Sequence, residues 1–241
     1  MTHRRTWIAV LTLCFSLTGL RAQVATVRAR VEVDGSAKNR SSLPTSVVWL
    51  TPMAGAAGRP VSSPSDLPLR LTQKNKSFEP HVLVVPAGSA VEFPNRDPFF
   101  HNVFSLFEGK RFDLGLYEAG SSRMVQFDRA GISYIFCNIH PEMSAVVITL
   151  TTPFYAVIHG EGQVEIPNVP YGRYQFHIWS EGSGPENSQP PGSDFTIAES
   201  APKVVGVRVP AINRQNLAHK NKYGRDYDAP TPDSPVYHQQ P

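Results

Sequence analysis

Residues 132–150 read ISYIFCNIHPEMSAVVITL, and this stretch decides the fold of the chain. Each end of it is a run of β-branched and aromatic side chains, which is typical of strands. The segment between the two runs places a thiol at Cys137, an imidazole at His140 and a thioether at Met143. The sequence therefore predicts two strands joined by a short loop that carries three candidate metal ligands.

A fourth candidate ligand, His101, lies upstream in the sequence FFHNV. One Cys, two His and one Met make up the ligand set of a type 1 copper site, in which His₂Cys forms a trigonal plane and Met is a long axial ligand. We therefore predict copper as the cofactor and His101, Cys137, His140 and Met143 as its ligands. Zinc fits less well, because a thioether is a poor zinc ligand. Three simpler interpretations stay open: an inert buried thiol at Cys137, a core-filling role for Met143 and a His101 that is not a ligand.

Residues 1–22 have the features of a signal peptide. Two arginines stand near the start, an apolar stretch follows, and Ala22 offers a small residue at a cleavage site. The apolar stretch is shorter than the about 20 residues that span a bilayer, although an uncleaved anchor stays open. Cleavage would remove Cys14 and leave Cys137 without a partner for an internal disulfide. We therefore expect export, with the periplasm as the compartment, and a thiol that is held by a metal.

The charge of the chain does not indicate a polyanionic partner. The sequence has 23 Lys and Arg against 20 Asp and Glu. Three of the arginines lie in residues 1–22, which contain no acidic residue, so the remaining chain is close to neutral. We therefore expect neither a nucleic-acid partner nor a membrane partner beyond an uncleaved anchor. The sequence also contains no Gly-rich phosphate loop and no Ser-centred nucleophile motif.

Apolar runs separated by Gly and Pro recur at short spacing along the chain. This pattern is typical of β-sandwiches, so we predict an all-β fold. The tail, residues 211–241, is polar and Pro-rich, and we expect it to be disordered. The predicted strands are 27–33, 46–50, 82–85, 90–93, 102–107, 123–127, 132–136, 145–150, 156–158, 164–166, 173–179 and 204–209.

Three further stretches accompany the C-x2-H-x2-M spacing that starts at Cys137: FEPHVLVVPAG at 78–88, VEFPNRD at 91–97 and HNV at 101–103. With them, residues 69–152 resemble the cupredoxin family, and the ligand loop has the length of the amicyanin type. The resemblance implies a Greek-key β-sandwich. It implies, as copper ligands, His101 Nδ1, Cys137 Sγ, His140 Nδ1 and Met143 Sδ.

The flanks of this region resemble a second family. Residues 27–50 and the sequence GEGQVEIPNVPYGRY at 160–174 are similar to the two halves of a carboxypeptidase regulatory-like, transthyretin-type sandwich, with Val164 in place of the usual aromatic residue. We expect residues 24–64 and 153–210 to form one sandwich with the copper domain inserted between them. The whole arrangement is similar to exported methylamine utilisation-like proteins. The residues expected in the shared core include Val31, Trp49, Ile166, Tyr174 and Phe176.

We interpret the chain as a one-electron carrier that uses Cu(I) and Cu(II) and exchanges electrons with a redox partner protein. A copper-delivery protein and an interaction module stay open as alternatives. We expect no enzymatic activity, because four ligands leave the copper no open position. The backbone amide of Asn102 is a candidate donor to the Cys137 sulfur. We expect His140 to be the ligand nearest solvent, within a docking surface made by Pro98, Phe99, Phe100, Ile139 and Pro141.

Overall fold

The computed structural model describes residues 23–34, 43–53, 69–106, 109–181, 194–198, 204–212 and 219–227. These residues form strands, turns and loops and contain no helix, which confirms the predicted all-β class. It follows that none of them belongs to a helix able to cross a membrane. The predicted signal peptide, residues 1–22, lies outside the described residues. The strands are β1 (Val24–Asp34), β2 (Thr45–Pro52), β3 (Leu69–Arg70), β4 (Thr72–Lys74), β5 (Ser77–Glu79), β6 (Val82–Pro86), β7 (Ser89–Pro94), β8 (His101–Ser105), β9 (Phe112–Tyr117), β10 (Ser122–Phe127), β11 (Gly131–Cys137), β12 (Ser144–Leu150), β13 (Tyr155–His159), β14 (Gly162–Pro170), β15 (Gly172–Ser180), β16 (Asp194–Ile197) and β17 (Val204–Pro210).

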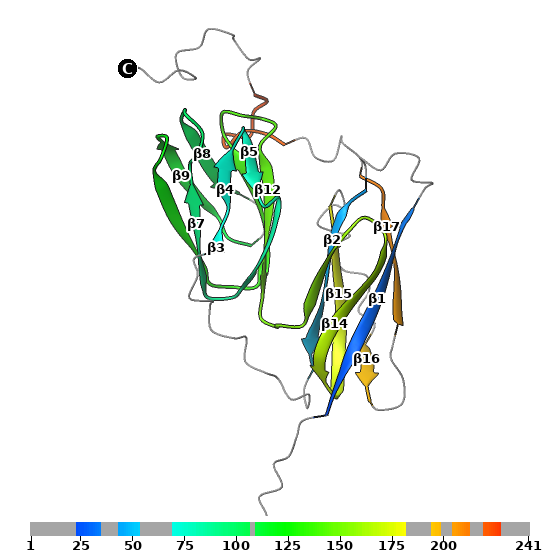
Figure 1. The fold of residues 1–241 in the computed structure, drawn as a ribbon. Helices are drawn as coiled ribbons and strands as arrows, with labels where there is room; N and C mark the ends of the chain where they lie inside the picture. Colours follow the sequence, from blue (N-terminus) through cyan, green and yellow to red (C-terminus); the bar gives the residue numbers. More distant parts are fainter. Residues whose placement is uncertain are drawn as a thin grey trace, which may run out of the picture.

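The first sandwich is built from strands between β3 and β12 (Figure 1). One sheet has the strand order β6-β12-β11-β8-β9, and the other has the order β10-β7-β3. Val103 and Ile135 from the larger sheet share a buried core with Phe93 and Val125 from the smaller one. Strand β11 pairs with both β8 and β12. The end of β11 therefore lies beside the strand that begins with His101.

Strand β12 is buried on both faces, which explains its unbroken apolar sequence. Ala145 and Val147 belong to the core of the first sandwich. Val146, Ile148 and Leu150 belong instead to a separate cluster that includes side chains from β2 and β15. A strand that is covered on both faces has no reason to alternate apolar and polar residues.

The sequence pattern does not predict strands β3, β4, β5, β9 and β16. Among them, β9 is the edge strand of the larger sheet. Its register with β8 shifts between Asn102 and Phe104, and Gly115 within it has a φ of 67°. A bulge of this kind interrupts the two-residue period on which strand prediction depends.

Strands from both ends of the described chain form a second pair of sheets, with the orders β14-β1-β17 and β13-β2-β15-β16. Val31, Ile166, Tyr174 and Phe176 lie together in the core between these sheets. Each sheet therefore contains strands from before and after the first sandwich. The domain limits and the likeness to carboxypeptidase regulatory-like sandwiches remain predictions.

We also expect Trp49 in this core, but the structure places it on the other face of β2. Val48 and Leu50 point into the core, so alternation along the strand turns Trp49 toward the first sandwich. Its ring stacks on His177, with 5.1 Å between the ring centroids. The expectation is wrong because β2 has two apolar faces, and hydrophobicity alone does not tell one face from the other.

A polar bridge crosses the same interface between the sandwiches. His81 Nε2 lies 3.0 Å from Glu181 Oε1, and His81 Nδ1 lies 3.0 Å from the carbonyl oxygen of Ser144. The second carboxylate oxygen of Glu181 accepts a hydrogen bond of 3.2 Å from the amide of Thr45. The bridge therefore links β2 to the residue that follows Met143.

The structure differs from the expected disordered tail at residues 219–227. Lys222 Nζ lies 2.8 Å from Asp113 Oδ2, and the hydroxyl of Tyr227 donates a hydrogen bond of 2.8 Å to the carbonyl oxygen of Cys137. Low apolar content does not reveal such a segment, because polar contacts hold it in place. Residues 213–218 and 228–241 of the tail lie outside the described residues.

Candidate metal centre

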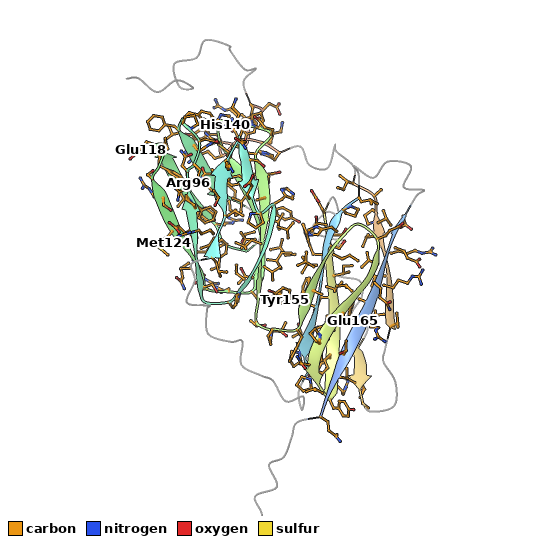
Figure 2. All side chains as sticks on the ribbon, in the orientation of Figure 1. Arg96, Glu118, Met124, His140, Tyr155 and Glu165 are labelled. Carbon is orange, nitrogen blue, oxygen red and sulfur yellow. The ribbon has the colours of Figure 1, made fainter. Side chains whose placement is uncertain are left out.

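Three of the four predicted ligands converge at one end of the first sandwich, where Figure 2 labels His140. His101 is the first residue of β8 and Cys137 is the last residue of β11. Cys137 pairs with Val103 across the β11–β8 ladder, so the ladder sets Cys137 beside the start of β8. All three predicted ligands are buried, with 2% exposure for His140 and none for His101 and Cys137.

Main-chain hydrogen bonds fold the loop after β11 back onto the strands. The amide of Asn138 donates to the carbonyl oxygen of Asn102 over 3.1 Å. The amide of Met143 donates to the carbonyl oxygen of His140 over 3.0 Å, and the amide of Cys137 donates to the carbonyl oxygen of Met143 over 3.3 Å. The backbone thus fixes the points from which Cys137, His140 and Met143 project.

The ligand atoms of the three buried residues form a nearly regular triangle. His101 Nδ1 and His140 Nδ1 lie 3.1 Å apart. The Cys137 Sγ atom lies 3.6 Å from the first nitrogen and 3.5 Å from the second. The point equidistant from atoms at these separations lies about 2.0 Å from each, close to the about 2.0–2.1 Å of a metal–imidazole bond and the about 2.3 Å of a metal–thiolate bond. A His₂Cys set of this size fits a first-row metal ion.

Met143 is fully buried and belongs to the same core cluster as Cys137. The hydrogen bond from the Cys137 amide to its carbonyl oxygen holds the two residues side by side. This position is compatible with a thioether ligand above the triangle and with simple core packing. The axial role predicted for Met143 therefore remains a prediction.

Burial raises the pKa of the Cys137 thiol, because the thiolate is less stable away from water. The backbone amides of Ile139, Asn102 and His140 oppose this rise by donating toward the sulfur. The contribution of Asn102 agrees with the expected contact between its amide and the sulfur, which remains a prediction. A buried thiol that faces several N–H donors is suited to hold negative charge once a cation lies beside it.

Both imidazoles are held in the neutral form that a metal requires. Burial, followed by the repulsion that His101 would exert if both rings were protonated, lowers the pKa of His140 to about 4. Burial also lowers the pKa of His101, although the Asp97 carboxylate opposes the fall. Neutral imidazole nitrogen is the metal-binding form of histidine, so little proton competition is expected near neutral pH.

Asp97 orients His101 and was not identified from the sequence. Its Oδ2 atom lies 2.8 Å from His101 Nε2, and its side chain is only 4% exposed. Burial acts to raise the pKa of Asp97, but the amide of Lys76, the His101 ring and the amide of Asn75 outweigh it and hold the pKa below its usual range. Since Nε2 is engaged by the carboxylate, the Nδ1 atom is the one that faces Cys137 and His140.

A second carboxylate supports the other side of the centre. The side-chain amide of Asn102 donates a hydrogen bond of 2.7 Å to Asp113 Oδ1. Burial would raise the pKa of Asp113, but its contacts with Lys222, Asn102 and the Gly115 amide lower it overall. Asp97 lies four residues before a candidate ligand, which is a detectable signal, whereas the role of Asp113 depends on the pairing of β8 with β9.

Phe99 packs against the centre and is only partly exposed. Its ring centroid lies 5.3 Å from that of His101 and 5.5 Å from that of His140. Phe100 is 39% exposed, while His140 is almost as covered as His101. Of the surface expected around His140, Phe100 is therefore a better candidate for contact with a partner than Phe99.

Comparisons with solved structures match the chain to copper proteins, but at low similarity. A purple cupredoxin from Nitrosopumilus maritimus is 21% identical, and the match covers 34% of this chain and 99% of that protein with a TM-score of 0.31. The amicyanin of Paracoccus versutus is 22% identical, with coverage of 42% and 97% and a TM-score of 0.32. A copper-containing nitrite reductase from Thermus scotoductus is 25% identical, with coverage of 42% and 27% and a TM-score of 0.34.

No protein-family model and no curated protein sequence matches the chain. The TM-scores of the structural matches are too low for a family assignment. The chemistry of the centre therefore has to be argued from its own residues.

Proposed function

We propose that this protein is a type 1 copper protein that carries single electrons through the Cu(I)/Cu(II) couple. The observation that supports this most directly is the buried triangle of His101 Nδ1, Cys137 Sγ and His140 Nδ1, with separations of 3.1–3.6 Å. Thiolate and thioether ligands favour Cu(I), and imidazole serves both oxidation states, so a His₂Cys set with Met143 suits one-electron exchange.

The surrounding residues would favour a fast electron exchange by keeping the ligands in place. His101 is held by Asp97 at its far nitrogen, and Cys137 ends a strand that is paired on both sides. Phe99 and Phe136 lie close to the ligand-bearing elements; Phe136 is buried and Phe99 is partly exposed. When bound, copper supplies the redox couple, while the protein supplies a rigid and largely dry ligand cage.

Optical and EPR spectra of the full chain loaded with Cu(II) test this proposal. We expect stoichiometric uptake, an intense blue thiolate-to-copper charge-transfer band and a small parallel hyperfine splitting. Cys137→Ser should abolish the blue band while far-UV circular dichroism stays that of a β protein. A colourless complex, or a blue band that survives in Cys137→Ser, would refute the assignment.

Electron transfer and copper delivery are separated by a second measurement. A carrier should show a reversible redox couple and should keep its copper in the presence of a chelator. Transfer of copper to a chelator within minutes would favour delivery. The burial of all three triangle residues favours retention, because the ion would have no open path to solvent through exposed ligands.

We also propose export to the periplasm, on the strength of the sequence features of residues 1–22. Cell fractionation with immunodetection, together with N-terminal sequencing of the mature protein, tests this. Full-length protein in the cytosolic fraction would contradict it.

A further inference from the structure

Residues 219–227 form a compact segment that lies across the end of the first sandwich at which the candidate metal centre is found. Figure 1 shows this segment in orange-red above β5, β8 and β12. The segment holds its own shape: the amide of Asn221 donates to Arg225 over 2.8 Å, and the amide of Gly224 donates to Asn221 over 2.9 Å. Lys220 and Asp226 form an ion pair across the segment.

Its contacts with the sandwich fall on residues adjacent to the predicted ligands. The Tyr227 hydroxyl donates a hydrogen bond of 2.8 Å to the carbonyl oxygen of Cys137 itself. The amide of Lys222 donates a hydrogen bond of 2.9 Å to Asn138 Oδ1, in the next residue of the loop. Two successive residues of the ligand loop are therefore tied from outside.

The same segment reaches β9, the neighbour of the strand β8 that carries the first ligand. Lys222 Nζ lies 2.8 Å from Asp113 Oδ2. The other oxygen of Asp113 accepts the bond from Asn102, the residue after His101. The Lys222 side chain is 20% exposed, so this ion pair is shielded more than an ordinary surface pair.

An aromatic contact completes the attachment. The His219 ring stacks on Phe136 with 3.9 Å between centroids, and its Nδ1 atom lies 3.2 Å from the Tyr227 hydroxyl. Burial lowers the pKa of His219, and the carbonyls of Lys220 and Pro141 oppose that fall. Phe136 precedes Cys137, so the segment contacts three consecutive residues from Phe136 to Asn138.

We infer that residues 219–227 are a positioning clasp for the copper centre, with Tyr227 as the positioning residue, and that the clasp limits motion of the Cys137–Met143 loop and loss of the metal. The inference rests on the proposed copper function, because the clasp is defined by the residues beside its ligands. The carbonyl of Cys137 has no ligand role, so Tyr227 acts through the loop and not on the metal.

Tyr227→Phe in the full chain tests the clasp, because it removes one hydroxyl and keeps the ring. Tyr155→Phe is the matched control, since Tyr155 lies on β13 in the second pair of sheets and is 38% exposed. Hydrogen exchange of residues 137–143 should become about fivefold faster in Tyr227→Phe, the factor expected for one net hydrogen bond. This measurement uses the metal-free protein and so stands whether or not copper binds.

Two further measurements separate positioning from general stability. Copper release to a chelator should become about fivefold faster in Tyr227→Phe, and the parallel hyperfine splitting should shift, while Tyr155→Phe matches the unaltered protein in both. His219→Ala, which removes the stacked ring and keeps the Tyr227 hydroxyl, should accelerate both hydrogen exchange of residues 137–143 and copper release.

Unchanged hydrogen exchange of residues 137–143 in both clasp variants would overturn the inference, even with the blue copper spectrum intact. Failure of the unaltered protein to bind copper would overturn the proposed function, and with it the metal-retention role of the clasp. Exchange that accelerates equally throughout the first sandwich would also overturn the inference, because Tyr227 would then serve only global stability.

Discussion

Asp97→Asn tests how much the His101 orientation contributes to the centre. The Asp97 carboxylate accepts hydrogen bonds from the amide of Asn75 at Oδ1 and the amide of Lys76 at Oδ2, with distances of 2.5 and 2.9 Å. Oδ2 also faces His101 Nε2 over 2.8 Å. All three neighbours present nitrogen donors, and two of them share one oxygen.

An asparagine at this position cannot satisfy all three donors. Its side chain has one acceptor oxygen and one NH₂ donor, so at least one N–H group faces another donor in either orientation. Each lost hydrogen bond to a charged group is worth about 1.5–3 kcal/mol. Since Asp97 is almost fully buried, we expect the free energy of unfolding of the metal-free protein to fall by about 2 kcal/mol. Copper affinity should fall roughly 10- to 100-fold, the usual effect of losing a carboxylate partner of a ligand histidine.

Urea unfolding of the metal-free protein and competitive copper titration measure these two effects. Asp128→Asn is the control, because Asp128 is an exposed carboxylate that pairs with Lys110 over 3.0 Å and lies away from the centre. The control should match the unaltered protein in both assays. If Asp97→Asn and Asp128→Asn give the same midpoint and the same affinity, the Asp97 carboxylate does not orient His101 and the reasoning fails.

Two other predictions follow from the structure. The contact with Glu181 raises the pKa of His81, and the contact with His81 lowers the pKa of Glu181 against the effect of burial. The bridge therefore stabilises the fold fully between the ordinary pKa values of the two groups. This stabilisation is lost as pH rises through the raised pKa of His81. In urea, the free energies of unfolding of the unaltered protein and of His81→Gln should differ by at most about 1 kcal/mol near about pH 5.5 and should converge near about pH 8.5. The difference is small because His81 is 42% exposed. A difference that grows with pH would contradict this prediction. Phe99→Glu should alter the copper spectrum, because the Phe99 ring centroid lies 5.3 Å from that of His101. Phe100 is 39% exposed, so Phe100→Glu should leave the spectrum unchanged and should slow electron self-exchange measured by NMR. An unchanged spectrum in Phe99→Glu would show that the ring is not part of the cage.

The features that sequence analysis found are those encoded locally. The apolar runs on either side of Cys137 and His140 correspond to β11 and β12, and the structure brings both residues together with His101. A loop of six residues between paired strands leaves its side chains few alternatives, so spacing is informative there. The role of Met143 is not settled in the same way, because a buried thioether suits a core as well as a metal.

The features that sequence analysis missed depend on contacts between distant segments. Tyr227 contacts a residue 90 positions away, and no periodicity or composition marks such a contact in a polar, Pro-rich tail. Trp49 illustrates a related limit, because β2 is covered on both faces and its hydrophobic pattern does not specify which face meets which core. Asp97 was visible as a carboxylate four residues before His101, but its role depends on the turn formed by Asn75 and Lys76.

Strand β12 suggests why the first sandwich and the flanking strands occur in one chain. Val146, Ile148 and Leu150 point away from the first core and pack with Val47 and Trp179. Removing the flanking strands would expose this row, at about 1.5–3 kcal/mol for each large apolar side chain. The row continues from Ser144, directly after the candidate ligand Met143, and Ser144 is also held by His81 in the bridge to Glu181. The flanking sheets thus brace the strand that leaves the ligand loop, while residues 219–227 hold the loop near the strand that enters it. This gives the flanks a structural role at the candidate metal centre.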